Sequence, residues 1–160
     1  MRIRQNMKKE PRIPFTQTGY NKVLGEKQKL LDERPDAVEN LRKSREMGDL
    51  SENGYYRASR ARLSYIDARL RSLERLVKLG IIVPAVQSSD TVEIGNTVTI
   101  SDGKKEFSYM IVGGYESNPS NNTISHISPL GKALMGKKKL DVATMNAPAG
   151  LKTYTILDIS

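Results

Sequence analysis

Two acidic residues stand three positions apart in a short break between two helical stretches of the sequence. From Arg45 to Asn53 the chain reads Arg-Glu-Met-Gly-Asp-Leu-Ser-Glu-Asn, which places Asp49 and Glu52 at positions i and i+3. This spacing is typical of a capping box, with Asp49 at the N-cap of the second helix and Glu52 at N3. Both carboxylates would also be stabilised by the positive end of the helix dipole. A structural interpretation therefore explains the pair.

A chemical interpretation follows from where the two acids lie. Two carboxylates at the end of a long helical hairpin can be delivered into a partner's cavity, where their oxygens suit Mg²⁺. The flanking residues Arg45, Arg57 and Arg60 carry guanidinium groups, which suit phosphates close to such a metal. The residues alone leave both interpretations open.

The other candidates for chemistry have ordinary structural explanations. The chain has no Cys, which excludes disulfides, thiol nucleophiles and Cys-ligated metal sites. Its single histidine, His126, lies in an alternating, strand-like run, and we expect a structural role for it. Gly113-Gly114 is not followed by the Lys-Ser/Thr of a phosphate loop and indicates a turn. The sequence contains no self-sufficient active site.

Two helices must position the acidic turn. The first is predicted from about Gly19 to Met47, with Thr16 or Thr18 as its cap. Its apolar pattern repeats every seven residues through Leu24, Leu31, Val38 and Arg45, with Tyr20 and Leu41 beside it. Pro35 lies inside this run, so a kink or a fresh helical start is expected there.

The second helix is predicted from about Glu52 to Leu79. It has a 3-4 heptad spacing made by Tyr56, Leu63, Leu70 and Val77 alternating with Ser59, Ile66 and Leu73. Two long helices joined by a short turn form an antiparallel hairpin. At 1.5 Å per residue each arm would extend about 40 Å.

The period changes to two after Gly80 and Pro84. Strands are predicted at residues 97–100, 107–112, 122–125 and 154–157, and a short helix at residues 129–137. The sequence thus predicts an α+β protein with an N-terminal antiparallel coiled-coil hairpin and a small C-terminal α+β domain. We expect a basic flexible arm at residues 1–14, the hairpin at 15–80 with its tip at 48–53, and the C-terminal domain at 84–160.

The charge lies in one half of the chain. The net charge of the 160 residues is +8. Residues 1–80 contain 19 Lys and Arg against 11 Asp and Glu, whereas residues 81–160 contain 7 of each. Such asymmetry indicates a polyanion or an acidic protein surface as partner. No stretch is apolar enough for a membrane span and no export signal is visible, so we expect no membrane partner and a cytoplasmic location.

The stretch from Ile13 to Tyr56 resembles the Gre family of bacterial transcript cleavage factors, of the GreA/GreB type. The family pattern at the tip, ARE-x-GDL-x-ENAEY, corresponds to residues 44–56, and Gly19-Tyr20 and Arg34-Pro35 match earlier family positions. The second half is similar too, at Gly95, Tyr109, Ile111-Val112-Gly113, Glu116, Ile124-Ser125, Ser128-Pro129-Leu130-Gly131, Ala133-Leu134, Gly136-Lys137, Pro148 and Gly150.

The resemblance implies a function as well as a fold. Gre factors bind RNA polymerase through an FKBP-like C-terminal domain and insert the coiled coil into its secondary channel. Backtracked nascent RNA is then cleaved by the polymerase itself, with Mg²⁺ shared between the tip acids and the polymerase active centre. The factor is accordingly expected to have no cofactor of its own and no catalytic activity alone, and to act as a monomer that meets DNA only through the elongation complex.

The family roles transfer to matching positions. Asp49 and Glu52 take the metal-assisting role, and Asn53 and Tyr56 complete the tip. Arg45 and Arg60 match basic positions that face the extruded RNA, with Arg57 beside them. Ser128 and Pro129 fall in the loop that contacts the polymerase at the channel rim.

The sequence departs from the family pattern just after the tip. Gly54 and Tyr55 replace the usual Ala-Glu, which removes one acid and lowers helix propensity by about 1 kcal/mol at the glycine. Ile127 replaces a polar residue before Ser128. Two alternatives stand beside transcript cleavage. The change to Gly54-Tyr55 favours a secondary-channel regulator that inhibits polymerase, although both tip acids are retained, and the charge alone suggests a general nucleic-acid-binding coiled coil.

Overall fold

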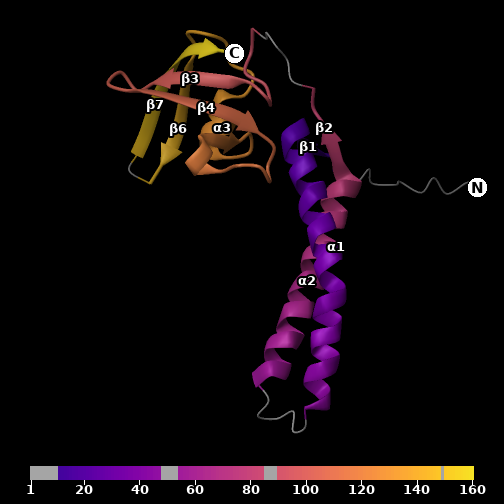
Figure 1. Ribbon diagram of the computed structural model, residues 1–160. Coiled ribbons are helices and arrows are strands. Elements are labelled where there is room, and N and C mark those ends of the chain that lie inside the picture. The colour runs from indigo at the N-terminus through magenta and orange to yellow at the C-terminus, as the bar shows by residue number, and fades with distance from the viewer. Residues whose placement is uncertain (1–10, 48–53, 85–89, 149) are drawn as a thin grey trace, which may run out of the picture. The chain divides into compact units, whose positions relative to one another are not determined.

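The computed structural model describes residues 11–47, 54–84, 90–148 and 150–160. The chain divides into two compact units, one made of residues 21–79 and the other of residues 1–20 together with 80–160. The first unit is a helical hairpin and the second is built on β-sheets (Figure 1). The predicted α+β class with an N-terminal hairpin is confirmed. No helix in the described ranges is long and apolar enough to cross a membrane.

The hairpin consists of α1 (Gln17–Glu46) and α2 (Gly54–Leu79), which have 30 and 26 residues. At 1.5 Å per residue they extend about 45 Å and about 40 Å. Both predicted helices are confirmed, and the predicted cap is found because the Thr16 hydroxyl accepts the Gly19 N–H at 3.0 Å. The predicted tip, residues 48–53, lies outside the described residues.

The buried face of α1 differs from the predicted stripe. The leucine and valine positions that suggested the repeat are each 41–42% exposed. The buried positions also repeat every seven residues, but one residue earlier: Leu30, Ala37 and Ser44. One residue turns a helix by about 100°, so the larger apolar side chains lie at the rim of the interface.

Pro35 lies within a single continuous helix, which excludes the fresh start, one of the two predicted alternatives; the predicted kink stays a prediction. Pro35 has no N–H to donate to the carbonyl of Leu31, so one helical hydrogen bond is missing there. Two cross-hairpin ion pairs, Glu33–Arg62 and Arg34–Asp67, lie directly before it. These contacts hold the two helices together beside the missing bond.

Two short strands, which the sequence analysis did not predict, frame the hairpin in the chain. β1 (Ile13–Phe15) pairs in parallel with β2 (Gly80–Ile82), which follows α2 directly. Phe15 is fully buried, and its ring lies 5.9 Å from that of Tyr20 and 6.4 Å from that of Tyr115. The strand includes Ile13 and Pro14, which the sequence analysis placed in the arm.

The second sheet has five strands in the order β5-β4-β3-β7-β6. Their bounds are β3 (Thr97–Ser101), β4 (Glu106–Val112), β5 (Thr123–Ser125), β6 (Val142–Ala147) and β7 (Gly150–Ile159). The β4–β5 pair is parallel and the others are antiparallel. The four predicted strands are confirmed. The sequence analysis missed β6, an edge strand in which only Ala143 is fully buried.

The core of this unit lies between one face of the five-stranded sheet and α3 (Pro129–Leu134) (Figure 1). Its buried members are Val92, Ile94, Val98, Ile100, Ile111, Leu134, Ala143 and Ile156. A 3₁₀ turn, η1 (Pro119–Asn121), precedes β5. The helix predicted at residues 129–137 is present but ends at Leu134.

Candidate functional site

In the sequence, the acidic pair predicted to do chemistry comes between the two helices of the hairpin. Asp49, Glu52 and Asn53 are outside the described residues, so their interpretation as a capping box or as metal ligands stays a prediction. α1 ends at Glu46, Met47 is the last described residue before the acidic pair, and α2 begins at Gly54. Residues 47–53 therefore connect the two helices at the end of the hairpin opposite Leu79.

Three predicted basic residues flank this connection. Arg45 lies in the last turn of α1, whereas Arg57 and Arg60 lie in the first two turns of α2. All three are exposed, and none forms an ion pair with another residue of the described ranges. Tyr56, the predicted support of the tip, is half-buried. The structure thus brings the three guanidinium groups to the turn end of the hairpin.

Nearby Arg42 is different because acids hold it on its own helix. Its Nη2 lies 2.8 Å from the Glu39 carboxylate, and its Nη1 donates to Glu46. The hydrogen bond from Arg42 lowers the pKa of Glu39 below its usual value, and the same contact raises the pKa of Arg42. The acids near the end of α1 are therefore already paired, which leaves Arg45 available for an external anion.

Ion pairs between α1 and α2 set the register of the hairpin along two seams. On the first seam Arg69 donates to both Glu26 carboxylate oxygens, at 2.6 and 2.8 Å, and Arg62 pairs with Glu33. The hydrogen bond from Arg69 lowers the pKa of Glu26, which marks this as a charged pair.

The second seam is made of Lys27–Glu74, at 3.8 Å, and Arg34–Asp67, at 2.7 Å. On each seam the partners advance seven residues along α1 while they move back seven along α2. This stepping is what an antiparallel heptad register requires.

In the described part of the hairpin, the ion pairs that join the two helices stop before the turn. One heptad beyond Glu33 and Arg62 lie Asn40 and Tyr55, which are joined by a Tyr55 hydroxyl to Asn40 Oδ1 hydrogen bond of 3.3 Å. One heptad beyond Arg34 and Asp67 lie Leu41 and Arg60. Because leucine cannot pair with a guanidinium group, the register itself leaves Arg60 without an acid across the hairpin.

The buried layer of the hairpin also changes toward the turn. Along α1 its side chains run from Leu30 through Ala37 to Ser44, and along α2 from Leu73 through Ile66 to Ser59. Every one of these six positions is at most 7% exposed. Since apolar burial contributes about 25 cal/mol per Å², the shrinking side chains stabilise the turn end less than the base.

The predicted polymerase-contact residues lie in the other unit, where their local role is structural. The Ser128 hydroxyl caps α3 by accepting the Gly131 N–H at 3.0 Å, and Pro129 takes the first helical position. A Cβ on Gly131 would lie 2.1 Å from the Ser125 carbonyl oxygen, so only glycine fits there. His126 is half-buried with Nδ1 3.2 Å from the Val112 carbonyl oxygen, in agreement with the structural role expected for it.

One important residue was not singled out by its chemistry in the sequence. Glu116 receives the backbone N–H and the hydroxyl of Thr16 and the N–H of Gly113. A Cβ on Gly19 would lie 1.4 Å from Glu116 Oε1, so any side chain there would displace this carboxylate from its hydrogen bonds. Nothing local in the sequence reveals a partner one hundred positions away. The Asn40–Tyr55 contact, in contrast, could have been found by extending the charged seams by one heptad.

Comparisons with known proteins cover both units. Residues 13–79 match the family model described as "Transcription elongation factor, N-terminal". Residues 87–160 match the one described as "Transcription elongation factor, GreA/GreB, C-term".

Curated relatives span nearly the whole chain. The transcription elongation factor GreA of a Nitratiruptor species is 39% identical over 153 residues, which cover 94% of either chain. The GreA of Helicobacter pylori (strain Shi470) is 40% identical over 150 residues, or 91% of this chain and 92% of the relative.

Among solved structures, that of GreA factor homolog 1 (Gfh1) of Thermus thermophilus aligns with 93% of this chain and 99% of its own. The two are 24% identical, with a TM-score of 0.44. The family assignment does not depend on this partial superposition, because the two family models together cover most of the sequence. The chain belongs to the GreA/GreB family of transcription elongation factors.

Proposed function

We propose that this protein binds RNA polymerase and stimulates the polymerase's own cleavage of backtracked nascent RNA. The hairpin enters the secondary channel with residues 47–53 leading, and the C-terminal unit contacts the channel rim through the segment at Ser128 and Pro129. The protein acts as a monomer in the cytoplasm and reaches DNA only through the elongation complex. Arrested complexes resume synthesis from the newly formed RNA 3′ end.

The observation that carries this proposal is the position of the acidic connection. Helices of 30 and 26 residues give a hairpin about 40 Å long, and Asp49 and Glu52 belong to the stretch of sequence that joins the two helices. The ion pairs between the helices stiffen the hairpin. A long, stiff hairpin with two acids in its connecting segment is suited to deliver them into a deep partner cavity.

The donor set suits a shared magnesium ion. Mg²⁺ prefers six oxygen ligands and is usually bound by one or two carboxylates together with waters and substrate phosphates. Asp49 and Glu52 supply two carboxylates, which is too few for a complete site of the protein's own. A metal shared with the polymerase would polarise the scissile phosphate and activate a water. We infer that the protein is not catalytic alone.

The basic residues at the turn end would orient the RNA. Arg45, Arg57 and Arg60 are exposed and have no acidic partner in the described ranges, so their guanidinium groups can bind phosphate oxygens. By contrast Arg62 and Arg69 are held in ion pairs. We therefore assign RNA contact to the first three and hairpin stability to the other two.

A cleavage assay on a defined backtracked complex tests the proposal. Wild-type protein with Mg²⁺ should accelerate RNA cleavage, and the isosteric Asp49→Asn/Glu52→Gln variant should bind polymerase equally well without accelerating it. Asp36→Asn, an exposed acid in the middle of α1, is the matched control and should behave like wild type. Full stimulation by the double variant would refute the metal-assisting role.

Two further measurements separate the alternatives. An inhibitory channel regulator would slow nucleotide addition in unstalled complexes, whereas a cleavage factor would leave it unchanged. A general nucleic-acid-binding protein would shift free RNA in a salt-sensitive manner. It would also be weakened equally by Arg57→Gln/Arg60→Gln and by Arg71→Gln/Arg75→Gln. Our proposal predicts that only the first pair impairs stimulated cleavage.

A further inference from the structure

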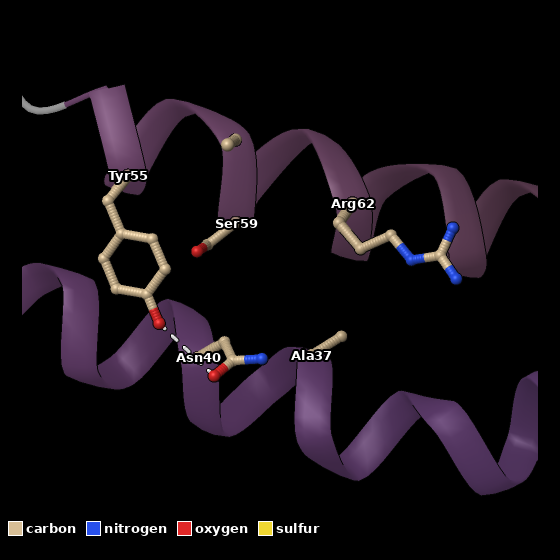
Figure 2. A pocket seen from close by; sticks show the side chains of 6 residues that line it. Ala37, Asn40, Tyr55, Ser59 and Arg62 are labelled. Atoms are coloured by element: carbon tan, nitrogen blue, oxygen red, sulfur yellow. Dashed lines mark hydrogen bonds between the residues drawn. The ribbon is translucent and has the colours of Figure 1, made fainter.

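A hollow opens between α1 and α2 in the half of the hairpin nearest the turn (Figure 2). Its volume is about 210 Å³. Its lining residues are Ala37, Asn40, Tyr55, Ala58, Ser59 and Arg62.

The hollow results from two changes toward the turn: the ion pairs between the helices end, and the buried side chains become smaller. Two lining residues, Ala37 and Ser59, have small side chains at heptad positions where the base of the hairpin has Leu30 and Leu73, and Ala58 beside them is small as well. Tyr55 and Arg62 are one heptad apart on α2 and form the two ends of the hollow (Figure 2). The space between them is therefore fixed by the register of the helices.

The groups around the hollow combine one aromatic ring with several hydrogen-bonding groups. The Tyr55 side chain is 43% exposed, and its hydroxyl reaches across to Asn40 Oδ1. That contact holds the Asn40 amide at the mouth, with its NH₂ group still able to donate (Figure 2). The amide and the ring thus present a hydrogen-bonding edge beside a flat apolar face.

Ser59 adds a polar group at the floor. It is only 7% exposed, and its hydroxyl forms no hydrogen bond with another described residue. Figure 2 shows this hydroxyl between Tyr55 and Arg62, directed into the space between the helices. No buried side-chain polar atom of the described residues lacks a partner, so this hydroxyl keeps some exposure and can bind a water or a ligand in the hollow.

Arg62 lines the other end with its aliphatic chain, and its guanidinium group is directed away from Tyr55 (Figure 2). Its guanidinium group pairs with Glu33 and lies 5.7 Å from the centre of the Tyr65 ring. These two contacts fix its orientation. None of the six lining residues is acidic, so a negatively charged backbone that passes the mouth is not repelled by them.

We propose that this hollow binds a single unpaired nucleobase of RNA. Proteins recognise unpaired bases by stacking them on aromatic rings and by hydrogen-bonding their edges, and Tyr55, Asn40 and Ser59 provide these groups. Drug-sized ligands need pockets of roughly 300–1,000 Å³, so 210 Å³ suits one ring system rather than a whole dinucleotide. The source of the RNA rests on the proposed function: it is the strand extruded by backtracking.

Binding by the free protein tests the hollow independently of polymerase. A short single-stranded RNA is titrated into the full chain at low salt, and the side-chain amide signal of Asn40 is followed by NMR. The signal should shift with the RNA and not with an abasic strand of the same length. A free nucleoside monophosphate should give a weaker shift than the RNA. Equal shifts with the abasic strand would mean phosphate contact only and would overturn the proposal.

Cleavage measurements test the hollow in the complex. With a base-bearing extruded RNA, Tyr55→Leu should raise the protein concentration for half-maximal stimulation about tenfold, within the range that one stacked base supports. Tyr55→Phe keeps the ring and should stay within about threefold of wild type. Ser64→Leu places an apolar side chain on the exposed surface of α2 outside the hollow and should have no effect.

The abasic RNA distinguishes the possible outcomes. If the base is the occupant, Tyr55→Leu and wild type should differ by less than twofold when the extruded nucleotides are abasic. An equal loss on both RNAs would show that Tyr55 serves the fold or a polymerase side chain, and the proposal would fail. If wild type stimulates cleavage of neither RNA, the proposed function fails, and the NMR titration still decides whether the hollow binds a base.

Discussion

The carboxylate of Glu116 accepts both the backbone N–H of Thr16, at 3.1 Å, and its hydroxyl, at 2.7 Å, across one hundred residues of sequence. The same carboxylate receives the Gly113 N–H at 2.7 Å. The Thr16 hydroxyl in turn accepts the Gly19 N–H in the first turn of α1. One acid therefore connects the start of the first helix to the loop after β4.

Substitution at two glycines of α1 tests this connection. A Cβ on Gly19 would collide with Glu116, whereas a Cβ on Gly25 meets nothing within 4 Å. Gly19→Ala should lower the free energy of unfolding by about 2 kcal/mol or more, because it displaces a hydrogen-bonded carboxylate. Gly25→Ala should raise it by up to about 1 kcal/mol. Thermal or urea unfolding measures both, and equal effects would contradict the Glu116 contact.

The Glu26–Arg69 pair predicts a pH dependence of hairpin stability. The Arg69 hydrogen bond lowers the pKa of Glu26 in the folded state, so the pair stabilises the fold above the unfolded pKa of about 4.3. That contribution is lost as the pH falls through the lower folded pKa. Both side chains are about 40% exposed, so the effect should be at most about 1 kcal/mol.

Urea unfolding between pH 3 and pH 7 measures this dependence. Arg69→Gln should be less stable than wild type at pH 7, and the difference should shrink below about pH 4 as Glu26 becomes protonated. Arg71→Gln removes a nearby arginine that has no ion pair within the described ranges, and it serves as the control. A difference that stays constant down to pH 3 would count against the charged pair.

Ser128 allows its structural role to be separated from polymerase contact. Ser128→Ala removes the cap of α3 and should cost about 1 kcal/mol of unfolding free energy. Ser128→Asp keeps a capping oxygen and should retain that stability, but it adds a negative charge to the segment proposed to contact polymerase. We therefore expect Ser128→Asp to unfold like wild type and to bind polymerase more weakly. Unchanged polymerase binding would remove Ser128 from the proposed interface.

The changing core of the hairpin predicts a gradient of hydrogen exchange. Among the described residues, the ion pairs between the two helices end at Glu33 and Arg62, and beyond them Ser44 and Ser59 replace larger buried side chains. Amides of residues 40–46 and 55–60 should therefore exchange faster than those near Leu30 and Leu73, because local opening there exposes less apolar surface. Exchange measured by NMR on the full chain checks this. Uniform protection along both helices would contradict the gradient.

Seven-residue repeats were sufficient to predict both helices of the hairpin but not the buried face of α1. The most hydrophobic side chains of the repeat, Leu24, Leu31 and Val38, are exposed at the rim of the interface. Burial at Ala37 and Ser44 depends on close approach to α2, which favours small side chains that a hydrophobic pattern does not detect. The type of element follows from local periodicity, whereas its orientation depends on the partner helix.

The pairing of β1 with β2 was also not predicted, because it too depends on a partner far away in the sequence. β1 and β2 have three residues each, and their pairing joins Ile13 to Gly80 across the whole hairpin. Neither segment is long enough to show an alternating pattern. Asp49 and Glu52, by contrast, lie three positions apart and are visible in the local sequence, but this spacing fits a capping box as well as a metal site, and their role stays a prediction.

Pro35 provides the last prediction, because an exposed proline inside a continuous helix should cost stability. Pro35→Ala restores an N–H for the Leu31 carbonyl, and alanine favours a helix interior by about 3 kcal/mol relative to proline. Part of this gain is offset because proline also restricts the unfolded chain. We therefore expect Pro35→Ala to raise the free energy of unfolding by about 1–2 kcal/mol, measured by circular dichroism during urea unfolding.

Asp36→Ala, at the adjacent exposed position, controls for helix propensity alone and should change the free energy of unfolding by less than about 1 kcal/mol. If Pro35→Ala gained no more than this control, the proline would be fully accommodated by the ion pairs of Glu33 and Arg34 beside it.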